Sequence, residues 1–409
     1  MAKIQITKDF LINTLKLTDE QAEYYYSKIE KSSFHAILNQ SEQMWLDKID
    51  FYKNEVGLSL DQILNYFTLL VLELSEKPSS ANKRIEYYKT ELGFTKKQFQ
   101  KIPNIITSDT FSSPEENPSS IRAKVKFFKT ELGFTNKQLK TTPSLLSYDC
   151  ILEDINNPTS IRSKIKFYKD TLGFTNKQFQ ILPKLLTSDC SSDESVPSSI
   201  RAKIKFYKDT LGFTNKQFQQ FPTLLCYDTY NEKNKTSVIR KIKFYKEKLG
   251  LTNENLQKFP ILLGLDCDEN SKNPKSVIKK LTILNEIGIT LADIQNNPRI
   301  LMCPTDDLKI KYMLWATMFP DKSYMKINGW FVTSPEKIYA RYMYIKHDLG
   351  LNLTPRQLDE SEPEFKKQFK ASSNDIMKLY PLNENAINQI YETYNSLKIE
   401  PPLQRIQGE

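Results

Sequence analysis

The sequence predicts an all-α protein, a solenoid of stacked three-helix repeats. Two observations carry this prediction: a long segment that recurs about every 40 residues, and a glycine that recurs with it. The segment "IRAKVKFFKTELGFTNKQLKTTPSLL" at residues 121–146 returns almost unchanged at residues 161–186 and again at 200–225. Self-similarity at this period is typical of helical repeats that stack in a row, because one small unit cannot bury its apolar face alone.

The recurring glycine sets the frame of the repeats. Eight of the eleven glycines hold one repeat position: Gly57, Gly93, Gly133, Gly173, Gly212, Gly250, Gly288 and Gly350. The longer gap before Gly350 predicts one degenerate unit near residues 315–332, and Lys16 takes the glycine position of an N-terminal unit. We therefore expect an array of about nine repeats over residues 1–355 and a C-terminal helical cap or extension over residues 356–409.

Each repeat is expected to hold two helices and a shorter third one. In the first helix, Ile121, Val125, Phe128 and Leu132 share one face and form a core stripe. The glycine that follows suits the left-handed residue that ends such a helix. A proline ten residues after the glycine ends the second helix and begins the third. Six second helices begin with the spacing of a capping box: Ser59/Gln62, Thr95/Gln98, Thr135/Gln138, Thr175/Gln178, Thr214/Gln217 and Thr354/Gln357.

Composition and motifs exclude several classes of function. No run of about 18 apolar residues is present, so no membrane helix is expected. The five cysteines are scattered and only two histidines accompany them, which excludes a zinc site. Cys150, Cys190 and Cys267 each follow an aspartate at the same repeat position, and we interpret them as reduced packing residues. Without a glycine-rich phosphate loop or a nucleophile–base motif, we expect no enzyme, no cofactor and no metal.

Positive charge is concentrated in the most regular repeats. The whole chain has a net charge of +9, but residues 119–250 alone hold 24 lysines and arginines against 12 acidic residues. On the first helix Arg122, Lys126 and Lys129 lie within about 60° of one another, beside the core stripe. The resulting row of candidate nucleic-acid-binding residues is Arg122, Lys126, Lys129, Arg162, Lys166, Lys169, Arg201, Lys205, Lys208, Lys243 and Lys246. Regular cations suit phosphates; the alternative is a solvated face.

Two further sets of positions have two interpretations each. Phe127, Phe167, Phe206 and Phe244 are expected to pack against the adjacent unit, with stacking on nucleic-acid bases as the alternative. Some positions near the proline differ among the closest copies, and drift is favoured there over a reading code. These positions are Lys140/Gln180/Gln219, Thr141/Ile181/Gln220 and Ser144/Lys184/Thr223.

The repeat pattern resembles that of the mitochondrial transcription termination factor (mTERF) family. The resemblance covers roughly residues 10–355 and is carried by "KFYKDTLGFTNKQFQQFPTLL", "TILNEIGITLADIQNNPRILM" and "TSPEKIYARYMYIKHDLGLNLTPRQL". It implies a left-handed superhelix of three-helix units that holds double-stranded DNA, or in some members structured RNA, in its groove. It also implies a role in organelle transcription, translation or nucleic-acid maintenance without catalysis.

The leading hypothesis is therefore a monomeric DNA-binding helical-repeat protein that regulates transcription or a related process. A protein-binding solenoid, including a host-directed effector, and a structured-RNA binder stay open as alternatives, and residues 356–409 could bind a protein partner. The N-terminal "MAKIQITKDFLINTLKLTDEQ" lacks the features of a signal peptide or a strong organellar presequence. An organelle, a bacterial cytoplasm and a host cell all stay open as locations.

Overall fold

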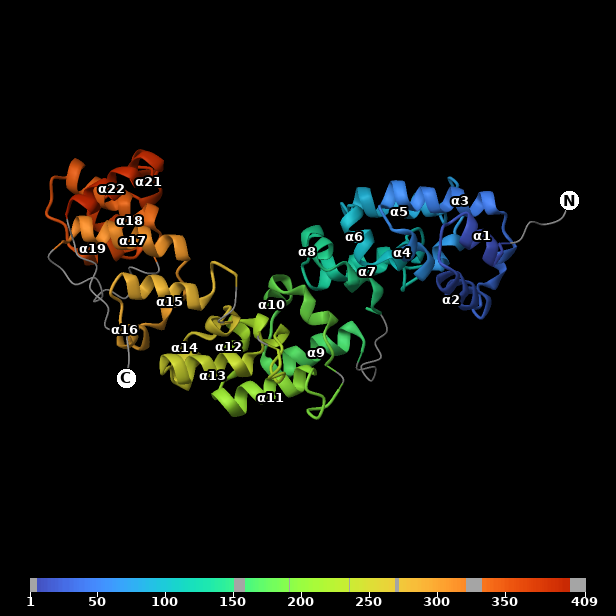
Figure 1. Cartoon of the computed structure of the whole chain (residues 1–409), viewed down its shortest axis with the longest axis horizontal. Helices are drawn as coiled ribbons and strands as arrows, with labels where there is room; N and C mark the ends of the chain where they lie inside the picture. The colour runs from blue at the N-terminus through green and yellow to red at the C-terminus, as the bar shows by residue number, and fades with distance from the viewer. Residues whose placement is uncertain are drawn as a thin grey trace. The chain divides into compact units, whose positions relative to one another are not determined.

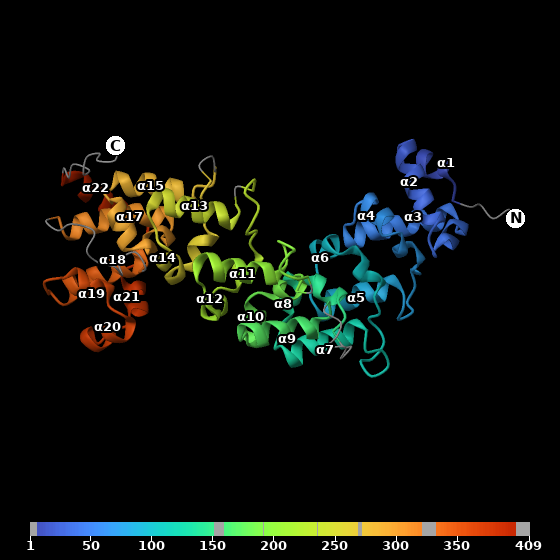
Figure 2. The same cartoon turned by 90° about the horizontal axis from the view of Figure 1, so that it is seen from below.

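The computed structural model of the chain describes residues 6–150, 159–190, 192–234, 236–268, 272–320 and 333–397, and these residues form helices and no strand. The chain divides into two compact units, residues 1–201 and 202–409. Within each unit the repeats follow one another in space in the order of the sequence (Figure 1), as the view from below in Figure 2 also shows, and the last helices of unit 2 fold back on earlier ones. The repeated helix–turn units make the described part of the chain an all-α solenoid.

Unit 1 begins with α1 (Lys8–Asn13), α2 (Asp19–Glu30) and the 3₁₀ turn η1 (His35–Asn39). The first helices of its repeats are α3 (Glu42–Phe51), which continues into the π-helical turn η2 (Tyr52–Val56), α5 (Ala81–Glu91), α7 (Ile121–Glu131) and α9 (Ile161–Leu172). The second helices are α4 (Leu60–Asn65), α6 (Lys96–Lys101), α8 (Asn136–Thr141) and α10 (Asn176–Ile181). The third are short 3₁₀ helices: η3 (Phe67–Val71), η4 (Pro103–Thr107), η5 (Pro143–Ser147) and η6 (Pro183–Thr187).

Unit 2 continues the pattern from α11 (Ile200–Leu211), whose first two residues belong to unit 1. It holds the first helices α13 (Val238–Leu249) and α15 (Val277–Glu286), the second helices α12 (Asn215–Gln220), α14 (Asn253–Lys258) and α16 (Leu291–Asn296), and the 3₁₀ helices η7 (Pro222–Cys226), η8 (Pro260–Gly264) and η9 (Pro298–Met302). Then follow α17 (Thr305–Met318), α18 (Pro335–Met343), η10 (Tyr344–Asp348), α19 (Pro355–Asp359), α20 (Glu362–Phe369), α21 (Ser373–Leu379) and α22 (Glu384–Ser396). The last helices cover earlier ones, because α21 packs on α18 and α22 on α17.

The local predictions for the repeat are confirmed. All eight glycines of the repeat position have positive φ, and Lys16, which takes the same position, also does, at 60°. The six predicted capping boxes are all formed. The core stripe of α7 is buried, and so are Cys150, Cys190 and Cys267. The degenerate unit expected near residues 315–332 lies mostly outside the described residues.

A buried or half-buried lysine in most of the first helices holds the third helix in place, and Arg84 takes this position in α5. Nζ of Lys124 donates to the carbonyl of Leu146 at 2.9 Å, and Nζ of Lys241 donates to that of Leu263 at 2.9 Å. The same bond to the end of the 3₁₀ helix is made by Lys48, Lys164, Lys203 and Lys280. Burial lowers the pKa of Lys124, since desolvation disfavours its charge. These bonds satisfy carbonyls that a short helix leaves without a partner.

Consecutive repeats are joined by side-chain amides that cap the preceding first helix. Nδ2 of Asn136 on α8 donates to the carbonyl of Glu91 on α5 at 2.7 Å, and Asn176 on α10 does the same to Glu131 on α7. Nε2 of Gln180 donates to the carbonyl of Leu132 at 2.7 Å. In unit 2, Gln257 and Gln295 bond in the same way to Leu211 and Leu249. The C-terminal carbonyls of a first helix are therefore satisfied by the next repeat.

The C-terminal helices are fixed by a buried arginine. The guanidinium of Arg341 is fully buried and donates to Ser373 Oγ at 2.9 Å, to the carbonyl of Leu358 at 3.0 Å and to Glu362 Oε2 at 3.2 Å. Partial burial alone would raise the pKa of the Glu362 carboxyl. Hydrogen bonds from Ser373 and Lys337 outweigh it and lower the pKa to about 2.

We expect acid to loosen these helices through Glu362. Its folded pKa of about 2 lies below the usual 4.5, so its stabilisation is complete above pH 4.5 and is lost as the pH falls toward 2. Because the side chain is 41% exposed, solvent screening reduces the effect to about 1 kcal/mol. Thermal unfolding followed from pH 6 to pH 2 should show a smaller acid-dependent loss for Glu362→Gln than for the unmodified protein. Equal pH profiles would contradict this assignment.

Candidate nucleic-acid interface

The structure places the predicted basic row on successive first helices of each unit. In unit 1, α7 carries Arg122, Lys126 and Lys129, α9 carries Arg162, Lys166 and Lys169, and Arg201 stands at the beginning of α11. In unit 2, α11 carries Lys205 and Lys208, and α13 carries Lys243 and Lys246. All eight lysines of the row are exposed. The side chains of these lysines are therefore accessible to a ligand in both units.

The arginines of the row do not behave like its lysines, because each stacks on an aromatic ring of the preceding repeat. The guanidinium carbon of Arg162 lies 4.7 Å from the ring centre of Phe127, and that of Arg201 lies 4.4 Å from Phe167. Arg122 covers Tyr87 in the same way at 4.7 Å. Such cation–π contacts stabilise packing. The prediction that the phenylalanines at this position pack against the adjacent repeat is confirmed for Phe127 and Phe167.

The same arginines are also hydrogen-bonded to the loop that precedes their helix. Nε of Arg122 donates to the carbonyl of Thr110 at 2.7 Å, and Nε of Arg162 donates to that of Cys150 at 3.1 Å. Nε of Arg201 donates to the carbonyl of Cys190 at 3.2 Å. A stacked and bonded guanidinium joins two repeats. These three residues therefore contribute charge to the surface but have structural roles of their own.

Carboxylates lie close to parts of the row. Nζ of Lys126 is 3.2 Å from Glu115, and the two terminal nitrogens of Arg162 bond to the two oxygens of Glu131 at 2.7 and 3.0 Å. Together with the buried Lys124, the basic residues of α7 divide into three roles. Lys124 belongs to the core, Arg122 joins two repeats, and Lys126 and Lys129 face solvent.

We expect Arg162→Lys to weaken the junction between α7 and α9 although it preserves the charge. A lysine cannot stack flat on Phe127 while bonding both oxygens of Glu131 and the carbonyl of Cys150. The free energy of unfolding of this region should fall by about 1–2 kcal/mol. Amide hydrogen exchange of α7 and α9 measures it, with Lys169→Arg as the exposed control. Unchanged exchange in Arg162→Lys would contradict the structural role.

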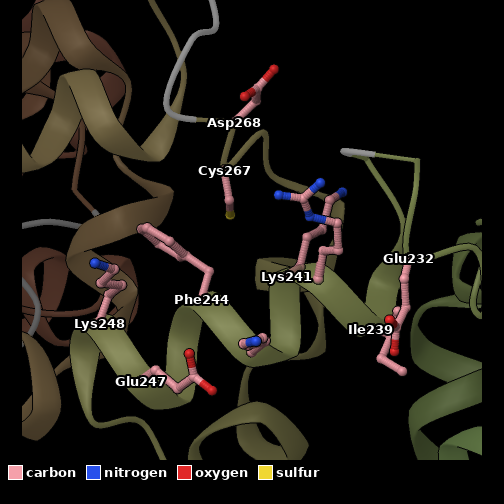
Figure 3. Close-up of a pocket in the computed structure, with 10 residues that line it drawn as sticks. Glu232, Ile239, Lys241, Phe244, Glu247, Lys248, Cys267 and Asp268 are labelled. Atoms are coloured by element: carbon pink, nitrogen blue, oxygen red, sulfur yellow. The ribbon is translucent and has the colours of Figure 1, made fainter.

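A cavity of about 440 Å³ lies beside α13 in unit 2 (Figure 3). At this place the stacking of an arginine on the aromatic residue of the preceding repeat is missing. Phe244 projects toward it from α13, and Cys267 points toward it from the segment after η8. Ile278 holds the place that Arg122, Arg162 and Arg201 hold in other repeats, so no arginine of α15 covers the ring of Phe244. The aromatic residue one repeat earlier is Phe206, and its ring packs against that of Tyr230 instead, with 4.9 Å between the two ring centres.

The charges around this cavity are mixed. Arg240, Lys241, Lys243 and Lys248 line it together with Glu232, Glu247 and Asp268. Burial raises the pKa of the Cys267 thiol to about 11, so the sulfur stays protonated at neutral pH and is a poor nucleophile. The sequence did not single out this cavity; the signal for it was the isoleucine in place of the repeated arginine. Of the four aromatic residues considered from sequence, Phe244 lines this cavity.

Other kinds of site find little support in the described residues. No group of three or more histidine, cysteine, aspartate or glutamate side chains is placed to hold a metal ion in the part of the chain described. No helix in that part is long and apolar enough to cross a membrane. No protein-family model matches this chain, and a comparison with curated proteins finds no match. The resemblance to the mTERF family therefore depends on the repeat pattern alone.

Proposed function

We propose that this chain binds nucleic acid, with duplex DNA favoured, and acts in transcription or a related process without catalysis of its own. The observation that supports the proposal is the recurrence of two exposed lysines at the same positions of successive first helices. These are Lys126/Lys129 and Lys166/Lys169 in unit 1, and Lys205/Lys208 and Lys243/Lys246 in unit 2. Cations at regular steps fit a phosphate backbone and need no contact with the bases.

The finer features of the proposal come from the resemblance to the mTERF family. On that basis we propose repeats of the mTERF type, a left-handed superhelix and a monomer that holds the duplex in its groove. The stacked arginines fit this proposal, because a rigid junction between repeats keeps the lysines at fixed spacing. Structured RNA offers the same phosphate chemistry and is the alternative ligand.

The experiment is a titration of labelled duplex DNA with the full-length protein at several salt concentrations. The affinity should fall on the order of 10³-fold between about 50 and about 200 mM salt, in a linear plot of log K against log salt. A structured RNA of equal charge, titrated in parallel, separates the two ligands. If no duplex is bound at low salt, or if binding ignores salt, the proposal fails.

A protein partner at the C-terminal helices is the second candidate function. Leu351, just before α19, and Leu379 of α21 are 50% and 68% exposed, and a partner that covered them would gain from burying their apolar surface. A nuclease-treated pull-down tests it. A partner retained by the unmodified protein and lost by Leu351→Ser/Leu379→Ser would support this function, and identical recovery by both proteins would remove it.

A further inference from the structure

A second basic surface is formed by the second helices of unit 1, and it shares no residue with the row predicted from sequence. A cavity of about 550 Å³ is lined by Lys97 and Lys101 of α6 and by Lys137 and Lys140 of α8. The other residues that line it are Thr90, Leu92, Gly93, Gln98, Asn136 and Thr141, and none of these is acidic. We call this site the lysine cavity.

The lysine cavity has no acidic residue in its lining, whereas two members of the first-helix row have carboxylate partners. In the row, Lys126 and Arg162 have carboxylate partners at 3.2 and 2.7 Å. Within the described residues, none of the four lysines of the cavity forms an ion pair. Four ammonium groups that line one cavity make its electrostatic potential positive, which favours a bound anion.

The sequence of the second and third helices explains why no acidic residue lines this cavity. The segments 95–107, 135–147 and 175–187 together hold seven lysines and no aspartate or glutamate. The first helices and the loops before them, in contrast, include Glu91, Glu115, Glu131 and Asp170. The surface of the second helices is therefore the one where the positive field is least cancelled.

A smaller cavity continues this surface toward the next repeat. It measures about 260 Å³ and shares Lys101 and Thr141 with the lysine cavity. Lys184 lines it as well, together with the hydroxyl-bearing residues Thr142, Ser144 and Thr187. Lysine and hydroxyl side chains are the common donors to phosphate oxygens in nucleic-acid complexes. Two adjoining cavities of this composition suit phosphate groups that follow one another along a chain.

We infer that the lysine cavity and its smaller neighbour bind successive phosphate groups of a phosphodiester backbone. This inference rests on the proposed function and locates the main phosphate contacts of unit 1 on α6, α8 and the third helices that follow them. It gives the position of Lys140, which differs among the repeats, a role in binding. Gln180 at the same position of the next repeat instead bonds to the carbonyl of Leu132.

The test compares two full-length variants that lose the same charge. The cavity variant replaces Lys97, Lys101, Lys137 and Lys140 by glutamine, and the row variant replaces Lys126, Lys129, Lys166 and Lys169 by glutamine. The cavity variant should bind duplex DNA on the order of 100-fold more weakly and lower the salt slope by about 3. The row variant should lose about tenfold or less. Circular dichroism checks that both variants keep their helix content.

Two additional measurements separate the outcomes. Inorganic polyphosphate serves as a second probe, and acetylation of lysines with and without ligand reports which ammonium groups become protected. Equal losses in the two variants, or protection of Lys129 without protection of Lys101, would overturn the inference while nucleic-acid binding stands. If the unmodified protein binds polyphosphate through the cavity but no nucleic acid, the proposed function fails and the phosphate site stands. If it binds neither, both fail.

Discussion

Lys124→Glu is expected to lower the free energy of unfolding of its region by about 3–5 kcal/mol. The buried ammonium group of Lys124 donates to the carbonyl of Leu146, and a glutamate at this position would face that oxygen with its own. Asp149 lies close enough to interact with Lys124, so it would add repulsion. The new carboxyl would have to stay buried without a partner or take up a proton, and both cost free energy.

The matched control is Lys129→Glu on the same helix. It makes the same change of charge at an exposed position, so its effect should stay within about 0.5 kcal/mol. Amide hydrogen exchange of α7 and η5 is the measurement, because a repeat array need not unfold in a single step. Similar losses in the two variants would mean that Lys124 is not the bond that holds the third helix.

Gly250→Ala is expected to destabilise unit 2 by about 2–3 kcal/mol. Gly250 has φ of 62°, where a residue with a Cβ is strained. An added Cβ would also overlap Nε2 of Gln295, which donates to the carbonyl of Leu249 at 3.0 Å. The substitution therefore strains one backbone position and displaces the amide that caps α13 from the next repeat.

Gly350→Ala separates these two effects. Gly350 has the same φ of 62°, but no atom lies within 4 Å of an added Cβ. Its cost should be the backbone strain alone, about 1–2 kcal/mol. Thermal and urea unfolding of the two variants, followed by circular dichroism, gives the difference. Equal destabilisation would show that the bond between Gln295 and Leu249 contributes nothing.

Features that depend on nearby residues could be predicted from the sequence. Gly133 and the pair Thr135/Gln138 act within a few residues of chain, so their spacing was enough to place the helix end and the capping box. The third helix was expected as well, although its 3₁₀ form was not. The core stripe of α7 followed from the helical period.

The roles of the basic residues could be predicted only in part. Lys124 lies about 60° from Ile121 around the helix, on the side away from Arg122. The helical period that predicted the core stripe could therefore have predicted the burial of Lys124 as well. Its partner Leu146 is 22 residues further along the chain, and that bond requires the position of the third helix. The stacking of Arg162 on Phe127 depends on how two repeats pack, which no local pattern contains.

The lysine cavity had a sequence signal of a different kind. Its segments lack acidic residues altogether, but the count of charge over residues 119–250 left out residues 95–107 and mixed residues 135–147 with the first helices, which hid the contrast. Lys97 and Lys137 come together only because α6 and α8 are neighbours in space. Charge counted by repeat position, rather than along the chain, would have separated the two surfaces.

The amide caps between repeats make the completion of a first helix depend on the order of synthesis. The carbonyl of Glu91 receives its hydrogen bond from Asn136, 45 residues later, and the carbonyl of Glu131 receives one from Asn176 after the same interval. Each of these two first helices is therefore synthesised before the residue that caps it from the next repeat. The first helices α5, α7, α11 and α13 are completed only by the next repeat. A chain shortened from its C-terminal side just after one of them ends in a helix with open carbonyls, whereas one shortened from its N-terminal side does not.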